Sequence, residues 1–174
     1  HHLIKSGGNS ILSVIQKWFK MEIDREETYG DKSRFIKYKI NHLNIFSDTC
    51  ITSHFQYDGV FLHQRYPELI ARKNEFRIFI FVRDPLCFRI SHYYYTRHEA
   101  ENSIYTLEQV LSCDENWISK LIPCNEFNYK EVMDKYFFIG ITEKMQESFD
   151  LLADLAGKKR IKLPFANVSE KDDQ

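Results

Sequence analysis

The residue types best suited to holding a phosphate group lie at the beginning of the chain, where Lys5–Ser10 reads Lys-Ser-Gly-Gly-Asn-Ser. Gly7 and Gly8 allow the backbone to fold tightly against a ligand because neither residue carries a Cβ. The hexapeptide leads into an amphipathic helix, whose first amides have no intrahelical partner and point toward any anion placed there. A lysine charge and two serine hydroxyls would add donors. These features predict a phosphate cradle, and an ordinary strand-to-helix turn is the alternative.

A second group of residues that could bind phosphate follows the apolar run 77–82. Arg83 ends this run, and Ser91 comes eight residues later, two turns into a helix that Asp84-Pro85 would begin. A guanidinium beside a hydroxyl suits a terminal phosphate. Because ligands gather at the carboxyl ends of strands in an open parallel sheet, both motifs could face one ligand. Without the first motif, Arg-Asp-Pro would be read as a helix cap with a surface salt bridge.

Together the two motifs resemble those of the sulfotransferases that use 3′-phosphoadenosine-5′-phosphosulfate (PAPS), in particular the heparan-sulfate 2-O-sulfotransferase-like carbohydrate branch. Segment 2–10 resembles the family's Lys-[Ser/Thr]-Gly-Gly-x-[Ser/Thr] loop, and segment 81–95 resembles its Arg-Asp-Pro element. Segments 138–143 and 163–169 resemble later landmarks of that branch. The chain departs from the family pattern in two places. Ile4 stands where the family has proline, and a basic loop and further helix expected after Asn167-Val-Ser are not in the sequence, which suggests truncation or an absent cofactor lid.

The resemblance implies an enzyme that moves a sulfuryl group from PAPS to a hydroxyl of a carbohydrate or similar acceptor, with adenosine 3′,5′-bisphosphate as product and no metal ion. Positioning and stabilisation of charge would dominate, as they do in phosphoryl transfer. Lys5 would act catalytically at the oxygen that leaves with the phosphate. The residues that would hold the 5′-phosphate are Ser6, Gly7, Gly8, Asn9 and Ser10, and those that would hold the 3′-phosphate are Arg83 and Ser91.

His54 is the candidate general base. It closes the second predicted strand, and the ordinary histidine pKa of about 6.5 suits proton removal near neutrality. The tetrapeptide 52–55 resembles the Gly-His-[Val/Phe] element that supplies the base in the 2-O branch, with Ser53 in place of the glycine. A structural histidine at a strand end is the alternative. Competing candidates for the base are His63, His92, His98 and Glu143.

The elements that must position these residues indicate an α/β protein, a single domain over 1–174 with a P-loop-type three-layer fold whose largely parallel central sheet is flanked by helices. Strands are predicted at 1–4, around 50–52, at 77–82 and at 136–139, and a surface loop at 22–34. A first helix carries the apolar stripe Ile11, Val14, Ile15, Trp18 and Phe19. A last helix, capped by Thr142 and stopped by Gly157, carries Met145, Phe149, Leu152 and Leu155. The other predicted helices are 86 to about 97 and, in an accessory region 99–135, 106–112, 117–121 and 129–135.

Composition limits the partners. The 174 residues carry a net charge of −1, which gives no whole-molecule reason for binding nucleic acid or a membrane surface. No apolar run approaches the roughly 20 residues that span a bilayer. The cysteines lack CxxC spacing, which argues against zinc, and Cys113 and Cys124 could pair in an oxidising compartment or remain free thiols. We expect a cytoplasmic location, with the Golgi lumen as the alternative if an N-terminal anchor was removed.

Two other functions are compatible with the same residues. One is a P-loop nucleotide kinase or nucleoside triphosphatase, but in GxxxxGK[ST] the lysine follows the glycines and here it precedes them. Asp84, the available magnesium-binding aspartate after an apolar strand, has the position of a helix cap. The other alternative is a catalytically degenerate relative that binds glycans without turnover.

Overall fold

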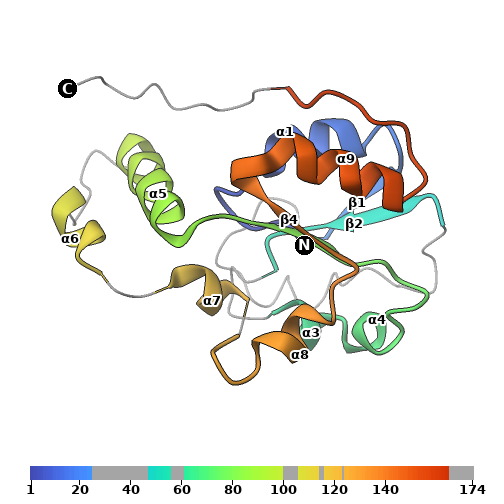
Figure 1. The fold of residues 1–174 in the computed structure, drawn as a ribbon, viewed down its shortest axis with the longest axis horizontal. Coiled ribbons are helices and arrows are strands. Elements are labelled where there is room, and N and C mark those ends of the chain that lie inside the picture. The colour runs from blue at the N-terminus through green and yellow to red at the C-terminus, as the bar shows by residue number, and fades with distance from the viewer. Residues whose placement is uncertain (25–46, 56–60, 100–105, 114–115, 123, 165–174) are drawn as a thin grey trace.

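The computed structural model describes residues 1–24, 47–55, 61–99, 106–113, 116–122 and 124–164. These residues form short parallel strand pairs surrounded by helices (Figure 1). The expected α/β class and parallel pairing are therefore confirmed, while the described strands form two separate two-stranded sheets. The pairs are β1 (Lys20–Ile23) with β2 (Thr49–Thr52), and β3 (Phe79–Val82) with β4 (Phe138–Ile141).

The segment His1–Leu3 lies between the two sheets without being a strand itself. The His1 amino group donates to the Phe79 carbonyl at 2.8 Å, and the His2 amide donates to the Ser53 carbonyl at 3.3 Å. The strand predicted at 1–4 is therefore wrong as an element. One backbone hydrogen bond to each side is too few for a ladder, but it places the segment beside both β2 and β3.

The first helix, α1 (Gly8–Ile15), buries Ile11, Val14 and Ile15 as its apolar stripe predicts. It ends earlier than predicted, and the chain turns at 16–19 into β1. The loop predicted from residue 22 is wrong at its start, and residues 25–34 lie outside the described part of the chain. Trp18 still packs in the core, with its ring 4.8 Å from that of Phe149. The apolar periodicity thus reports burial beyond the point where the helix ends.

The last helix, α9 (Met145–Leu155), follows a short 3₁₀ turn, η2 (Thr142–Lys144). Gly157, at φ 66°, ends it as predicted. Two details of the prediction are wrong. The Thr142 hydroxyl does not cap the helix but donates to the Val82 carbonyl at 2.9 Å, and Leu155 is 53% exposed because the buried face ends with Leu152.

The helix after β3, α5 (Pro85–Glu99), begins where Asp84-Pro85 predicted. The Asp84 carboxylate accepts from the Cys87 amide at 2.9 Å, which satisfies one of the free donors at the helix start. The predicted accessory helices are confirmed. Helix α7 (Trp117–Leu121) has the predicted bounds, and α6 (Leu107–Leu111) and α8 (Tyr129–Met133) are shorter than predicted. Two further short helices were not predicted from the sequence: α3 (Leu62–Arg65) and α4 (Pro67–Ala71).

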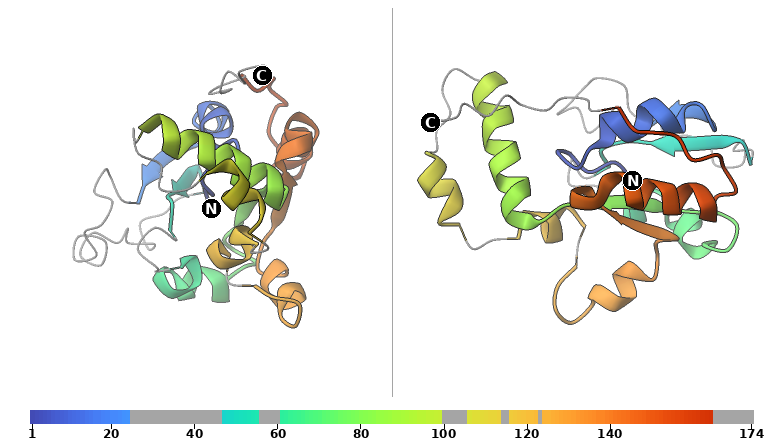
Figure 2. Two further views of the ribbon diagram at one scale, coloured as in Figure 1. Left: turned by 90° about the vertical axis from the view of Figure 1, so that its left-hand side faces the viewer. Right: turned by 45° about the horizontal axis from the view of Figure 1, so that its top comes forward.

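Helices α1 and α9 lie on one side of the strands, and α3, α4 and α8 lie on the other (Figure 1; Figure 2). Helices α5 and α6 extend from one end of the molecule. One apolar cluster joins α1 and α9 to Phe81, and a second joins α5, α7 and α8 to Leu3 and Ile80. The second cluster therefore anchors the chain just before Lys5–Ser10, at Leu3, and the first anchors α1 just after it. None of the described helices is long and apolar enough to cross a membrane.

Candidate functional site

The loop Lys5–Ser10, called the glycine loop below, turns sharply into α1. Gly7 has φ 75° and precedes the first helical residue, while Lys5 has φ 54°, a conformation that costs a residue with a Cβ about 1 kcal/mol or more. A Cβ on Gly7 would lie 2.2 Å from the Met145 methyl carbon. The loop therefore needs glycine at this position, and it leaves the opening amides of α1 without partners inside the helix.

The polar side chains of the glycine loop are divided between the interior and the surface. Ser6 is 2% exposed, and its hydroxyl donates to the Ile4 carbonyl at 3.4 Å. Ser10 is also buried, whereas Asn9 is exposed. The structure thus places the two serines, expected to hold phosphate, where they stabilise the loop from within. The backbone amides and Lys5 are therefore the groups of the loop that remain to bind a phosphate.

Arg83 connects the two sequence motifs. It follows the carboxyl end of β3, and its Nη1 donates to the Lys5 carbonyl at 2.9 Å. Its Nε atom is buried and has no hydrogen-bond partner, and the nearest carboxylate, that of Glu143, lies 3.8 Å away. Glu143 also accepts from the Asp84 amide at 3.0 Å. The guanidinium is therefore held beside the glycine loop with hydrogen-bonding capacity left over.

Helix α5 brings an aromatic ring to the glycine loop. The Lys5 ammonium lies 4.4 Å from the centre of the Tyr95 ring, within the range of a cation–π contact. Ser91 is half-buried and lies one helical turn before Tyr95, on the same face of α5. The structure thus directs the Ser91 face toward Lys5, but it shows no direct contact between Ser91 and Arg83.

His54 follows β2 and reaches the chain just before the glycine loop. Its Nδ1 lies 3.0 Å from the His2 carbonyl oxygen, and its ring centre lies 4.0 Å from that of His2. A carbonyl oxygen can only accept, so Nδ1 carries the proton when the ring is neutral and Nε2 presents a lone pair. Burial, and then the charges of His54 and the amino terminus, lower the pKa of His2 to about 3.

The competing bases lie in other surroundings. His92 packs against Phe88 and Trp117, and burial followed by the Lys5 charge lowers its pKa. His98 lies near the far end of α5, and Glu143 serves as a neighbour of Arg83. His54 contacts the segment that leads into the glycine loop, through the hydrogen bond to the His2 carbonyl.

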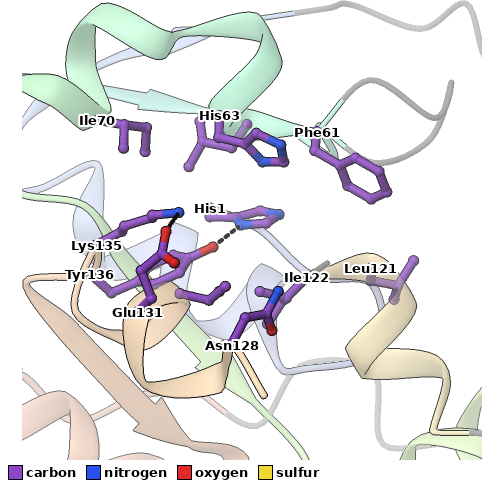
Figure 3. A pocket seen from close by; sticks show the side chains of 12 residues that line it. His1, Phe61, His63, Ile70, Leu121, Ile122, Asn128, Glu131, Lys135 and Tyr136 are labelled. Carbon is purple, nitrogen blue, oxygen red and sulfur yellow. Dashed lines mark hydrogen bonds and ion pairs between the residues drawn. The ribbon is translucent and has the colours of Figure 1, made fainter. Parts of the chain in front are cut away.

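His63 lines a different cavity, of about 200 Å³, whose walls come from α3, α4, α7, α8 and His1 (Figure 3). The Tyr136 hydroxyl lies 3.0 Å from His1 Nδ1, and Lys135 pairs with Glu131 at 3.1 Å in its wall. Burial raises the pKa of the Tyr136 phenol, so this group stays neutral. The lining includes none of the residues expected to bind PAPS. Beneath the glycine loop there is a smaller cavity of about 30 Å³, bounded in part by His2, Ser6 and Gly8.

Three residues at this site were not among the site residues predicted from the sequence. His2 was quoted only as part of the loop motif, yet it contacts both Gly8 and His54. Tyr95 could have been found from its helical spacing after Ser91. Thr142 joins the glycine loop to β3 through its hydroxyl, which lies 3.4 Å from the Ser6 carbonyl as well as bonding to β3, and no local pattern indicates this role.

Within the described ranges, no three side chains of His, Cys, Asp or Glu gather where they could hold a metal ion. Cys113 and Cys124 are free thiols, as are Cys50 and Cys87. Of the segment 163–169, which resembles a family landmark, residues 165–169 lie outside the described residues. No protein-family model, curated protein or solved structure matches the chain. The function must therefore be inferred from the residues and contacts of the site.

Proposed function

We propose that this protein transfers a sulfuryl group from PAPS to a hydroxyl group of a carbohydrate or similar acceptor. The proposal rests on the motifs Lys5–Ser10 and Arg83-Asp-Pro, which resemble those of PAPS-dependent sulfotransferases, and on their placement. The observation that carries it is the hydrogen bond from Arg83 Nη1 to the Lys5 carbonyl, at 2.9 Å. Two segments 78 residues apart in sequence are thereby joined, and both would contact one doubly phosphorylated ligand.

The residues present fit such a ligand in two respects. The buried Nε of Arg83 has no hydrogen-bond partner, so it could donate to a bound phosphate. Helix α1 begins directly after Gly7, and its first amides, which have no partners inside the helix, would hold the 5′-phosphate. Arg83, with Ser91 on the adjoining helix, would hold the 3′-phosphate. When bound, PAPS would supply a sulfuryl group whose S–O bond to the phosphate breaks as a bond to the acceptor oxygen forms.

Lys5 and His54 would divide the remaining tasks. The Lys5 ammonium would stabilise negative charge on the leaving phosphate oxygen. His54 would take the acceptor's proton at Nε2, because Nδ1 is committed to the His2 carbonyl. The Tyr95 ring lies under the ammonium and would restrict the directions in which Lys5 can reach.

A thermal-unfolding experiment tests the ligand. Adenosine 3′,5′-bisphosphate should raise the melting temperature, because a ligand that binds the folded state stabilises it by mass action, by about 2.7 kcal/mol at 100 times its Kd. ATP with magnesium is the matched comparison. Stabilisation by ATP and magnesium but not by the bisphosphate would favour the nucleotide kinase or triphosphatase and contradict the proposal.

A transfer assay tests the chemistry. Radiolabelled sulfate should pass from PAPS to at least one member of a glycan panel. His54→Ala should lower kcat by about 100-fold or more while the bisphosphate Kd stays unchanged, since general-base catalysis contributes about 10²–10⁴-fold. Bisphosphate and glycan binding without transfer would identify a catalytically degenerate relative. Unchanged turnover of His54→Ala at saturating substrate would remove His54 from the base role.

A further inference from the structure

The His2 side chain contacts both the glycine loop and His54. A Cβ built on Gly8 would lie 1.6 Å from His2 Nε2 and 2.1 Å from Cδ2, so the imidazole rests directly against the Gly8 backbone. The His2 ring centre is also 4.0 Å from that of His54, with 34° between the ring planes. One imidazole therefore touches both a residue expected to bind phosphate and the candidate base.

The His2 backbone reinforces this connection. Its carbonyl accepts from His54 Nδ1 at 3.0 Å, and its amide donates to the Ser53 carbonyl at 3.3 Å. The chain of His2 is thus bonded on both sides of the peptide to the residues at the end of β2. Because burial keeps the pKa of His2 far below neutrality, its ring adds no positive charge beside His54 under working conditions.

We propose that His2 is a positioning residue, whose imidazole holds the His54 ring at a set angle to the glycine loop. The inference rests on the proposed function, because it assigns His54 the base role. A displacement of the Gly8 backbone would push on the His2 ring and through it on His54. Occupation of the glycine loop and orientation of the base are therefore mechanically linked.

Removing the ring should affect chemistry and leave ligand binding intact. In His2→Ala the backbone groups of residue 2 remain, but the ring that packs against His54 is lost and no longer holds the His54 ring on the residue-2 carbonyl, so we expect kcat to fall about 100-fold, as a misplacement near 1 Å can cause. The bisphosphate Kd should change by less than about threefold, because His2 supplies no phosphate contact. His2→Phe preserves a flat ring without a titratable group, and its kcat should stay within about threefold of the unchanged protein.

Nuclear magnetic resonance of the ring nitrogens gives a readout that does not depend on turnover. The unchanged protein and His2→Phe should show the Nδ1–H tautomer of His54. His2→Ala should show a mixture of tautomers, because the ring is then free to turn away from the His2 carbonyl. An unchanged single tautomer and unchanged kcat in His2→Ala would overturn the inference.

A double-mutant cycle tests the contact itself. Gly8→Ala places a methyl group where the His2 ring stands, so it should lower kcat strongly in the native background. With His2→Ala the ring is gone, and the same methyl group should cost at least about tenfold less. Independent, multiplicative effects would contradict the contact. Absence of any transfer by the unchanged protein would overturn both proposals, whereas normal transfer with an insensitive His2 would overturn this one alone.

Discussion

Two arginines near the ends of strands differ in how completely they are paired. Arg65, on α3, has a side chain 3% exposed, and its Nε and Nη2 donate to the two carboxylate oxygens of Asp24 at 2.5 and 2.6 Å. The Tyr66 hydroxyl donates to the same carboxylate at 2.7 Å. Arg83 is 27% exposed and keeps a buried Nε without a hydrogen-bond partner.

The difference separates a folding role from a binding role. Asp24 is fully buried after β1, and Arg65 neutralises it while fastening α3 to that strand end. The Asp24 carboxylate already neutralises the Arg65 guanidinium, so Arg65 is not expected to bind a further anion. Arg83 donates to a backbone carbonyl at 2.9 Å and lies 3.8 Å from the Glu143 carboxylate, so its Nε keeps a hydrogen-bond donor for a ligand. Burial and ion pairing, more than residue type, therefore decide which arginine can bind an anionic ligand.

The largest expected effect breaks the saturated pair. Arg65→Met should lower the free energy of unfolding by about 3–5 kcal/mol, because it leaves the Asp24 charge buried and unpaired. Denaturant unfolding monitored by circular dichroism measures the loss. The double change Asp24→Leu with Arg65→Met should recover most of it, since both charges are then removed. A loss below about 1 kcal/mol in the single variant would contradict a buried, charged Asp24 that depends on Arg65.

Arg83→Ala should give the opposite pattern. The single bond to the Lys5 carbonyl predicts a stability loss of about 1 kcal/mol, whereas bisphosphate affinity should fall about 10- to 150-fold, the value of one charge-assisted contact. Isothermal titration calorimetry measures the affinity. Arg77→Ala is the matched control, because Arg77 is exposed and precedes β3 at its opposite end. Equal losses of affinity in both variants would argue against a site at Arg83.

Acid should act on the glycine-loop region through His2. Its pKa is about 3 in the folded protein against 6.5 as the ordinary value, so the unfolded chain binds a proton that the folded chain does not. This contribution to stability is fully present above pH 6.5 and is lost as the pH falls toward 3. Between pH 7 and pH 5 the loss should be about 2 kcal/mol. Unfolding curves of His2→Phe should lack this component; an identical pH dependence would contradict it.

The smallest effect concerns the carboxylate beside Arg83. Glu143→Gln keeps an acceptor for the Asp84 amide but removes a negative charge 3.8 Å from Arg83 Nε. Bisphosphate affinity should rise about two- to fivefold, and stability should change by less than about 0.5 kcal/mol, as for a partly exposed pair. The gain should shrink at high salt. Lower affinity would instead show that Glu143 is needed to orient Arg83, as Asp24 orients Arg65.

Local patterns in the sequence predicted the elements with the clearest boundaries. Asp84-Pro85 marks the start of α5, Gly157 marks the end of α9, and the apolar run at 77–82 contains β3. Such signals depend on a few neighbouring residues, so they survive without knowledge of the rest of the chain. The early end of α1 and the start of β1 were mispredicted because burial of Trp18 imitates helical periodicity.

The short helices α3 and α4 show where such patterns fail. Neither is long enough to be stable alone, and both depend on burial of Tyr66 and on the pairing of Arg65 with Asp24, which is 41 residues away in sequence. No window of the sequence contains both partners. The same reason explains why the sequence could suggest His54 as a base without indicating that His2 lies against it.

The sequence by itself determined the chemistry available at the site: a glycine-rich turn with a lysine before it, an arginine at a strand end, and a histidine after another strand. The tertiary structure decided which groups are accessible and which meet. It turned the Ser6 hydroxyl inward, left Arg83 Nε without a hydrogen-bond partner, and set the His2 ring against both Gly8 and His54. The meeting of Arg83 with Lys5, 78 residues apart, and of His54 with His2, 52 residues apart, depends on packing between distant segments, which is not written in any local pattern.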